Sequence, residues 1–243
     1  MKKRNTLLIP AIALLGSSLC SAAVYNVKYL GGLPPIPTSS LQGVLGGTGE
    51  SWNQATGTFS NLVDSTGGSS SISVAGLSGG QNEGPASSIF FGNSNAFGKG
   101  DNQTISISGL AAAGVYNIYI YALSHNTPSW GNFGDTERAA GAFTTTNVSG
   151  NGASQPLDNG NTGTNATTFT AGSNYVLFQS IVADGAGNIS IVADALNNTS
   201  LDPQNPNATR LHINGLQIAS IPETSSAALL GLGAVALILR RRK

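Results

Sequence analysis

Charged residues are scarce in this sequence. Asp, Glu, Lys and Arg make up 9% of the 243 residues, against about 25% in an average soluble protein. Seven of the eleven basic residues lie in residues 2–4 and 240–243, so the body between them keeps four cations against ten acidic side chains and a net charge near −6. A mildly acidic body with scattered cations has no basic patch for phosphates, which excludes nucleic acid as a partner.

Thiols and imidazoles are scarcer still, with one cysteine and two histidines. Cys20 falls in an amino-terminal segment that we expect to be removed, so the mature chain has no disulfide, thiol nucleophile or thiolate metal ligand. His125 and His212 are far apart in the chain and share no HxxxH or HExxH spacing, the patterns typical of zinc sites. We therefore predict no metal site and no cofactor.

Calcium is the one metal for which the sequence leaves an alternative. The stretches DNGN (residues 158–161) and Asp184-Gly185 are loops with an acidic residue. Each offers a single carboxylate, whereas calcium takes about six to eight oxygen ligands, several of them usually from carboxylates. Asp-Gly also serves a tight turn by itself, so a turn is favoured over a structural calcium site.

Short strand-forming segments and turn residues are what the sequence has in abundance. Its 32 glycines, with many Ser, Thr and Asn residues, separate segments rich in Val, Ile, Tyr and Phe. In VYNIYIYAL (Val115 to Leu123) both alternating faces are largely apolar, which is typical of a strand in the middle of a sheet. The other expected strands are Val24–Leu30, two within Thr58–Leu77, Ser87–Ser94, Gln103–Leu110, Gly141–Val148, a hairpin within Asn174–Leu196 that turns at Asp184–Gly187, and Arg210–Ser220.

These segments predict an all-β fold class, because no long helical period lies between the termini. We expect a single antiparallel β-sandwich, jelly-roll-like, over residues 24–220. A signal-peptide helix (residues 1–23) and a hydrophobic helix (within residues 221–243) would flank it. A domain of this size buries roughly 70% of its unfolded surface, so it can fold without a metal or a disulfide.

The amino terminus has the three parts of a secretory signal peptide. Residues 2–4 are basic, residues 6–16 (TLLIPAIALLG) are apolar, and SSLCSAA supplies small residues for signal peptidase, with Ala22 or Ala23 as the last residue removed. The residues before Cys20 do not form a lipobox. We therefore predict export through the Sec translocon, with signal peptidase as the second partner.

The carboxyl end, IPETSSAALLGLGAVALILRRRK (residues 221–243), joins a turn, an apolar run and four basic residues. A soluble core helix would show a polar stripe, which this run lacks. The apolar stretch Ser225 to Leu239 rises about 22 Å at about 1.5 Å per residue, less than the about 30 Å of a bilayer core, so a span needs local thinning and snorkelling arginines. Basic residues at both ends of the chain predict cytoplasmic termini and an exported middle.

The Pro-Glu start, short apolar helix and basic end resemble the PEP-CTERM sorting signal of bacteria, which is read by exosortases, membrane cysteine transpeptidases. The resemblance implies an exosortase-like partner, initial anchoring in the inner membrane by the C-terminal helix, and delivery to the cell envelope, the outer surface or the extracellular matrix. The second Pro of the family motif is replaced by Thr. The implied sorting motif is Pro222, Glu223 and Thr224, and the implied cytoplasmic stop is Arg240, Arg241, Arg242 and Lys243.

The body resembles the same family. The runs SWNQATGTFSNLVDSTGGSSSISVAG, ISGLAAAGVYNIYIYAL, YVLFQSIVADGAGNISI and LHINGLQIA look like the extracellular β-sandwich of many PEP-CTERM proteins. Those domains are similar in build to galactose-binding and carbohydrate-binding jelly rolls. The resemblance implies the same sandwich over residues 24–220.

Aromatic residues in polar surroundings are the candidates for glycan binding. Trp130 lies in SHNTPSWGNFGDTE, and Trp52 lies in ESWN. Rings of this kind stack on the CH faces of sugars while neighbouring amides bond the hydroxyls. For each tryptophan the alternative is a ring packed onto the core. The neighbours of Trp130 that would complete such a site are Phe133, Asn132 and His125.

Catalytic patterns are lacking. The sequence has no GxSxG motif, and Asp135 and Glu137, the one close carboxylate pair in an aromatic loop, fit a solvated loop better than a glycosidase pair. We therefore predict no catalytic residues and no enzyme. The expected function is that of an exported structural or adhesive protein of the envelope or matrix. The alternative is a carbohydrate-binding module that recognises an extracellular polysaccharide through Trp130 and Trp52.

Overall fold

The computed structural model describes residues 22–30, 35–77, 95–97, 102–122, 138–146, 155–158, 168–195 and 209–222. All of them except Pro222 belong to one compact unit, Ala22–Ile221. The two predicted flanking helices, in residues 1–23 and 221–243, lie outside the described residues except for Ala22, Ala23, Ile221 and Pro222. Within the described ranges, no helix is long and apolar enough to cross a membrane.

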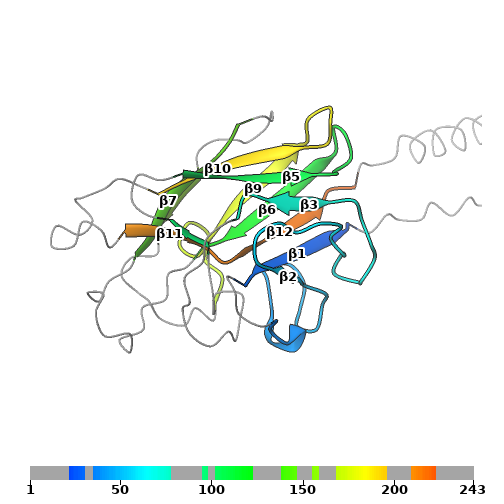
Figure 1. Cartoon of the computed structure of the whole chain (residues 1–243), viewed down its shortest axis with the longest axis horizontal. Coiled ribbons are helices and arrows are strands. Elements are labelled where there is room, and N and C mark those ends of the chain that lie inside the picture. The colour runs from blue at the N-terminus through cyan, green and yellow to red at the C-terminus, as the bar shows by residue number, and fades with distance from the viewer. Residues whose placement is uncertain are drawn as a thin grey trace, which may run out of the picture. The chain divides into compact units, whose positions relative to one another are not determined.

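Two β-sheets make up the fold, and the first has five strands in the order β2-β1-β12-β6-β9 (Figure 1). Its pairs are antiparallel except β1–β2, which is parallel. The strands are β1 (Val24–Tyr29), β2 (Asn53–Ala55), β6 (Val115–Tyr121), β9 (Tyr175–Val182) and β12 (Gly215–Ser220). A short 3₁₀ helix, η1 (Thr38–Ser40), lies between β1 and β2.

The second sheet has seven strands, with six in the order β3-β5-β10-β7-β11-β4 and β8 paired to β7. Its pairs are antiparallel except β7–β11, which is parallel. The strands are β3 (Ser73–Ala75), β4 (Asn95–Phe97), β5 (Asn102–Ser108), β7 (Arg138–Thr145), β8 (Gln155–Asp158), β10 (Ile189–Ala195) and β11 (Thr209–Ile213).

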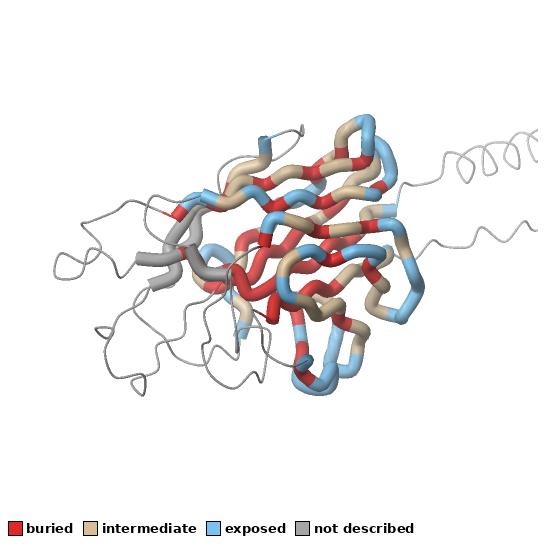
Figure 2. The backbone as a smooth tube through the Cα atoms, viewed as in Figure 1, coloured by how far each residue is buried: buried red, intermediate tan, exposed pale blue. Residues whose placement is uncertain are grey.

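The core lies between the two sheets, as the buried tubes of Figure 2 show. Alternate side chains of each strand point into it, because successive residues of a strand face opposite sides. This confirms the predicted all-β sandwich. The first sheet contributes Val27, Ile118, Ile120, Phe178, Leu216 and Ile218, and the second contributes Val74, Ile105, Ile107, Phe143, Ile189 and Ile191.

Strand β6 occupies the interior position that its sequence predicts. It lies between β12 and β9. Ile118 and Ile120 face the core between the sheets, and Tyr119 and Tyr121 belong to a second buried cluster on the outer face of the same sheet. A strand with two apolar faces therefore has both faces covered.

Two connections that the sequence predicts within one sheet, or within one strand, carry the chain to the opposite sheet instead. The predicted hairpin after Asn174 is wrong, since β9 pairs with β6 in the first sheet and β10 pairs with β5 and β7 in the second. The predicted last strand, Arg210–Ser220, is divided at Asn214 into β11 and β12, which belong to different sheets. A turn signal specifies local backbone shape, which is the same whether the next strand joins its neighbour or crosses to the opposite sheet.

The first and last strands meet at one end of the sandwich (Figure 1). Val24 of β1 pairs with Ala219 of β12. Just outside this pair, the Ser220 N–H donates to the Ala23 carbonyl oxygen at 2.9 Å, and the Ala23 N–H donates to Ser220 Oγ at 2.9 Å. The exposed Pro222 follows two residues after Ser220. Both ends of the compact unit are therefore held together.

Candidate functional site

Most of the residues predicted as a site lie outside the described residues. This applies to His125, Trp130, Asn132 and Phe133, and, in the sorting segment, to Glu223, Thr224, Arg240, Arg241, Arg242 and Lys243. Pro222 is described and is exposed. Trp52 is described, and its side chain is only 7% exposed.

Trp52 packs in the second cluster, on the outer face of the five-stranded sheet. Its ring is therefore not available to stack on a sugar, and the core-packing alternative describes it. The indole Nε1 is buried without a hydrogen-bond partner. The neighbouring Asn53 has a structural role too, since its Nδ2 donates to the Asn26 carbonyl at 2.9 Å and its Oδ1 accepts from the Val63 N–H at 2.9 Å.

The outer face of this sheet has a covered half and a half over which no described segment lies, which we call the open half. Over β1 and β12, the segment from Ile36 to Ser51 lies on the sheet, with Leu41, Val44 and Leu45 in the second cluster. Gln54 holds the start of the segment, because its side chain accepts from the Ile36 N–H and donates to the Ile36 carbonyl, both at 2.7 Å. This covering segment closes half of the face.

A chain of buried polar side chains ties the covering segment down. Gln217 of β12 is fully buried. Its Nε2 donates to Asn26 Oδ1 at 2.6 Å and to the Leu45 carbonyl at 2.9 Å, and its Oε1 accepts from the Leu45 N–H at 3.1 Å. Asn26 Nδ2 in turn donates to Glu50 Oε2 at 3.2 Å. Buried polar groups of this kind are stable because each has partners.

Tyr121 closes the same network from β6. Its hydroxyl donates to Gln217 Oε1 and accepts from the Val44 N–H at 2.7 Å. Burial raises the pKa of Tyr121 far above its usual value, the Val44 N–H bond lowers it by less, and Tyr119 and Tyr175 raise it further. Tyr121 is therefore neutral at all physiological pH values and acts as a structural hydrogen-bonding group rather than as an acid or base.

The open half lies over β6 and β9. Phe169, Tyr175 and Leu177 are partly exposed there and rest on buried Tyr119 and Tyr121. Ring centroids are 5.6 Å apart for Tyr121 and Phe169, 6.1 Å for Tyr119 and Tyr175, and 6.3 Å for Tyr121 and Tyr175, all tilted. We call Phe169, Tyr175 and Leu177 the β9 patch.

A β-bulge adds polar groups to this open half. The β6–β9 register shifts between Tyr116 and Ile118, so that Gln179 and Ser180 lie opposite Asn117. The Ser180 N–H donates to Asn117 Oδ1 at 2.8 Å, and Ser180 has a left-handed backbone with φ 55°. Gln179 and Ser180 are both exposed as a result. Bulges are frequent where a sheet re-aims side chains for binding.

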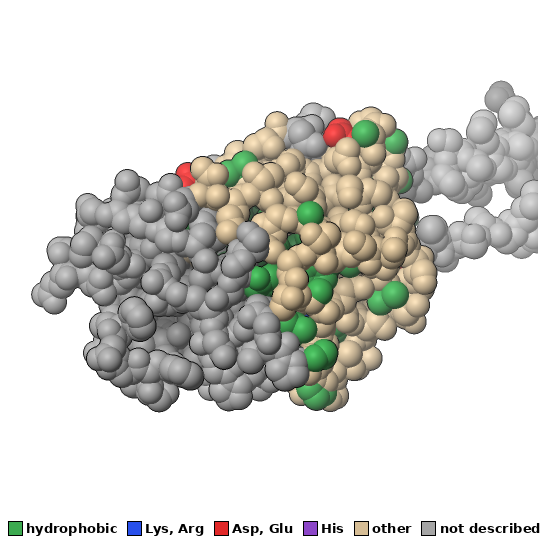
Figure 3. Space-filling model, in the orientation of Figure 1, with side chains coloured by type: hydrophobic (Ala, Val, Ile, Leu, Met, Phe, Trp, Pro, Cys, Tyr) green, Lys and Arg blue, Asp and Glu red, His purple; other side chains and the backbone are tan. Residues whose placement is uncertain are grey.

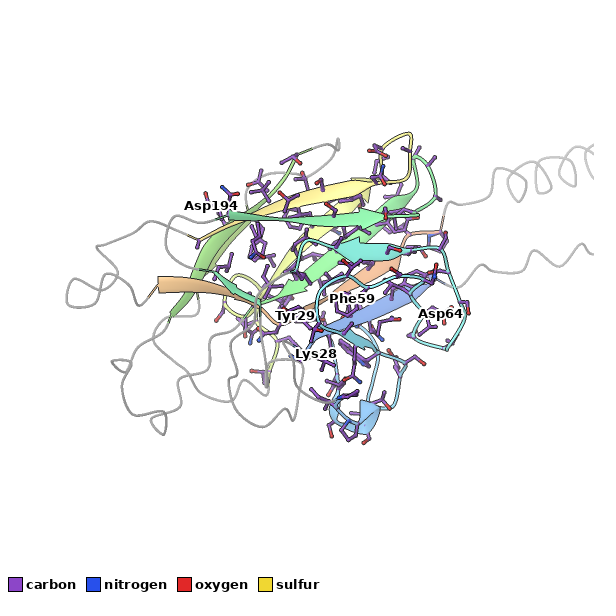
Figure 4. The ribbon with its side chains drawn as sticks, viewed as in Figure 1. Lys28, Tyr29, Phe59, Asp64 and Asp194 are labelled. Carbon is purple, nitrogen blue, oxygen red and sulfur yellow. The ribbon has the colours of Figure 1, made fainter. Side chains whose placement is uncertain are left out.

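Among the described carboxylates, Glu50 belongs to the Gln217 network, and Asp64 and Asp184 serve turns. Asp184 Oδ1 accepts from the Ala186 N–H at 2.9 Å and the Asn188 N–H at 2.8 Å, which is the expected turn role. The hydrogen bonds of Asp64 with Thr66 and its loop lower the pKa of Asp64. Asp64 and Asp194 lie at opposite ends of the sandwich (Figure 4). Within the described ranges, no three His, Cys, Asp or Glu residues are grouped so that they could hold a metal ion.

The described surface is mainly uncharged. On the face shown in Figure 3, polar side chains and backbone predominate, apolar side chains are scattered, and acidic ones are few. Lys28 of β1 is fully buried (Figure 4). It alternates with Val27 and Tyr29 of the main core, so it lies on the covered half of the outer face. The mainly uncharged surface agrees with the 9% of charged residues in the sequence.

The comparisons with known proteins leave the family open. No family model matches the chain, and no curated protein matches it. Among solved structures, the carbohydrate-binding module TmCBM61 in complex with beta-1,4-galactotriose matches with 11% identity and a TM-score of 0.24, over 61% of this chain and 77% of that chain. A similarity at this level carries no conclusion about function.

Proposed function

We propose that this chain is an exported, non-enzymatic structural or adhesive protein of the cell envelope or extracellular matrix, sorted by its C-terminal segment. The observation that supports this best is the pairing of β1 with β12, which brings both ends of the sandwich together. A signal peptide before Ala23 and a sorting segment after Ile221 then both leave from one end of the domain. The rest of the sandwich is left free to face outward.

The ends of the sandwich also favour one of the two signal-peptidase sites. Cleavage after Ala22 keeps both hydrogen bonds between Ala23 and Ser220, whereas cleavage after Ala23 removes them. The exposed Ala22 has neither bond to lose. A mature protein that begins at Ala23 would therefore keep the two ends of the sandwich bonded to each other.

The test follows the full chain in a bacterium that has an exosortase. An epitope tag is inserted between Gly185 and Ala186, an exposed turn in which an added side chain at Gly185 meets no other atom. We expect the tagged protein in the envelope or matrix fraction, with Ala23 at its amino terminus and without the apolar run, by intact-mass analysis. The double variant Pro222→Ala, Glu223→Ala should keep the apolar run and stay in the inner membrane.

Two outcomes would contradict this proposal. One is a tagged protein that keeps residues 1–22 and fractionates with the cytoplasm, which would contradict the prediction that the protein is exported. The other is equal processing of the wild type and the double variant, which would remove the sorting motif. The uncut double variant also serves as the control for loss of the tag by nonspecific proteolysis.

Carbohydrate binding is a second candidate function. It was expected through Trp130 and Trp52, and the packing of Trp52 removes that residue from the candidate site. What favours the function within the described residues is the β9 patch, where aromatic side chains remain partly exposed. Trp130 stays a prediction.

A further inference from the structure

The β9 patch combines partly exposed rings with a rigid support. Tyr175 is opposite Tyr121 in the β6–β9 register, and Leu177 is opposite Tyr119. The two β6 tyrosines beside them are buried, with Tyr121 fully so. An aromatic surface supported in this way loses little conformational freedom when it binds, because its rings are already held in place.

The loop before β9 holds Phe169 beside Tyr121. Asn174 is buried, and its Oδ1 accepts from the Thr170 N–H at 2.8 Å while its Nδ2 donates to the Thr168 carbonyl at 2.8 Å. The Ala122 N–H donates to the Asn174 carbonyl at 3.0 Å, which joins the loop to the end of β6. The hydrogen bonds of Asn174 to the backbone of Thr168 and Thr170, the residues on either side of Phe169, therefore fix the position of Phe169.

The chemistry of the open half suits an uncharged, hydroxyl-rich ligand. The three residues of the β9 patch carry no charge, and the bulge beside them presents the amide of Gln179 and the hydroxyl of Ser180. Apolar and aromatic side chains with a few well-placed polar groups are the usual lining of a small-ligand site. An anionic ligand would instead require cationic side chains for steering and affinity, and the patch has none.

The placement of the β9 patch suits an anchored protein. Val115, at the start of β6, accepts a hydrogen bond from the Ile221 N–H. Tyr121 ends the same strand about 20 Å away, at about 3.3 Å per residue, and Tyr175 lies beside it. The β9 patch is therefore at the end of the sandwich opposite to both chain ends.

We propose that the β9 patch binds a neutral polysaccharide, with the rings of Tyr175 and Phe169 against sugar CH faces and the bulge amide and hydroxyl on sugar hydroxyls. The proposal deepens the second candidate function and rests on export, which brings the patch to extracellular glycans. It assigns to the sandwich a binding surface made of other residues than those of the Trp130 loop predicted from the sequence.

Affinity electrophoresis of the exported protein, as it is recovered from the cells, tests this proposal. The protein is extracted in a zwitterionic detergent without sugar groups, so that the detergent does not compete. Native gels contain hydroxyethylcellulose, galactan, xylan or dextran, and alginate serves as the anionic comparison. We expect retention by at least one neutral polymer and not by alginate. Tyr175→Ala should lower the apparent affinity about tenfold, as removal of a central aromatic contact does.

Matched variants distinguish loss of the aromatic contact from loss of the folded structure. Tyr175→Phe keeps the ring and should retain binding within about twofold, a change too small to signal loss of a main contact. Thermal unfolding of each variant confirms that it is folded, and Phe169→Ala provides a second lesion if Tyr175→Ala unfolds. Light scattering reports the oligomeric state.

Three results would overturn the proposal. They are no retention of the wild type by any neutral polymer, unchanged retention in both Tyr175→Ala and Phe169→Ala, and a change of oligomeric mass in place of a change of retention, which would assign the patch to protein association. None of these alters the tagged-protein localisation test, so failure of the site and failure of the export proposal are distinguishable.

Discussion

Gly76 shows how one residue can limit the sandwich. It has a backbone φ of +91°, which L side chains rarely adopt, and a Cβ added there would overlap the Thr104 carbonyl oxygen of the neighbouring strand β5. We expect Gly76→Ala to lower the free energy of unfolding by about 1–3 kcal/mol or more, because backbone strain and overlap act together. Urea unfolding followed by tryptophan fluorescence measures the change.

Gly185 provides the matched control for that substitution. It is exposed in the turn between β9 and β10, and an added Cβ meets nothing within 4 Å. Gly185→Ala should leave stability within about 0.5 kcal/mol of wild type, as surface substitutions usually do. Equal effects of the two alanines would show that the Gly76 backbone is not constrained as described.

The residue-scale predictions succeed where a pattern covers a whole strand and fail for isolated residues. The two apolar faces of Val115–Tyr121 identify a central strand, and the structure confirms it. The sequence leaves Trp52 with two alternatives, because nothing local distinguishes a ring that faces solvent from one that a distant segment covers. The partners of Gln217 are 172 and 191 residues away in Leu45 and Asn26, so no local pattern could reveal that network.

At the scale of elements, the covering segment Ile36–Ser51 depends on the Tyr121 hydroxyl. Tyr121→Phe removes one partner from the partly buried Val44 N–H and one from the buried Gln217 side chain. Leaving buried polar groups without partners costs about 1–3 kcal/mol. We expect a loss of unfolding free energy in that range, and faster cleavage by protease within the covering segment, read by mass spectrometry of the fragments.

Tyr119→Phe is the control for this element. Tyr119 lies two residues earlier on the same face of β6 and belongs to the same cluster, but its hydroxyl does not join the Gln217 network. Stability should change by less than about 0.5 kcal/mol, with wild-type proteolysis. If both phenylalanine variants behave alike, the hydroxyl of Tyr121 does not hold the segment.

At the element level, the sequence predicts three long strands closely and misses two short ones. Val24–Leu30, Gln103–Leu110 and Val115–Leu123 correspond closely to β1, β5 and β6. Strands β2 and β8 are three and four residues long and have too few alternations to be recognised. The expected strand Ser87–Ser94 lies outside the described residues.

At the scale of the whole molecule, buried tyrosines predict sensitivity to alkali. Burial raises the pKa of Tyr25, Tyr29, Tyr119 and Tyr121 in the folded protein. In the unfolded chain each tyrosine has a pKa of about 10. The folded state therefore binds more protons above that pH, and the stability from these neutral tyrosines is complete below about pH 10 and lost as the pH rises further.

Urea unfolding between pH 7 and pH 11 tests this dependence. We expect a fall in unfolding free energy that begins near about pH 10, with a shallower slope in Tyr121→Phe, because that variant lacks the most strongly shifted group. A slope equal to wild type in this variant would exclude Tyr121 as a main source. Tyr119→Phe, with a smaller shift, should lie between the two.

Whole-molecule architecture follows from the sequence only in part. The composition and strand pattern predict a sandwich, which the structure confirms, but they do not reveal which strands cross between sheets at Asn214 or after Val182. The network of buried polar side chains around Gln217 and the β9 patch depend on those crossings, because together they contain residues from β1, β6, β9 and β12. A site built from distant strands is visible only once the topology is known.

The position of β12 between β1 and β6 has a mechanical consequence. If the C-terminal segment holds the protein and a matrix polymer pulls on the β9 patch, tension passes from β9 through β6 into β12 and leaves at Ile221. The load then runs along the strand axes, and the hydrogen bonds of Gly215–Ser220 on both flanks are sheared together instead of being unzipped singly. Rupture would then need all of them to fail at once, so the central strand is the one best placed to carry force.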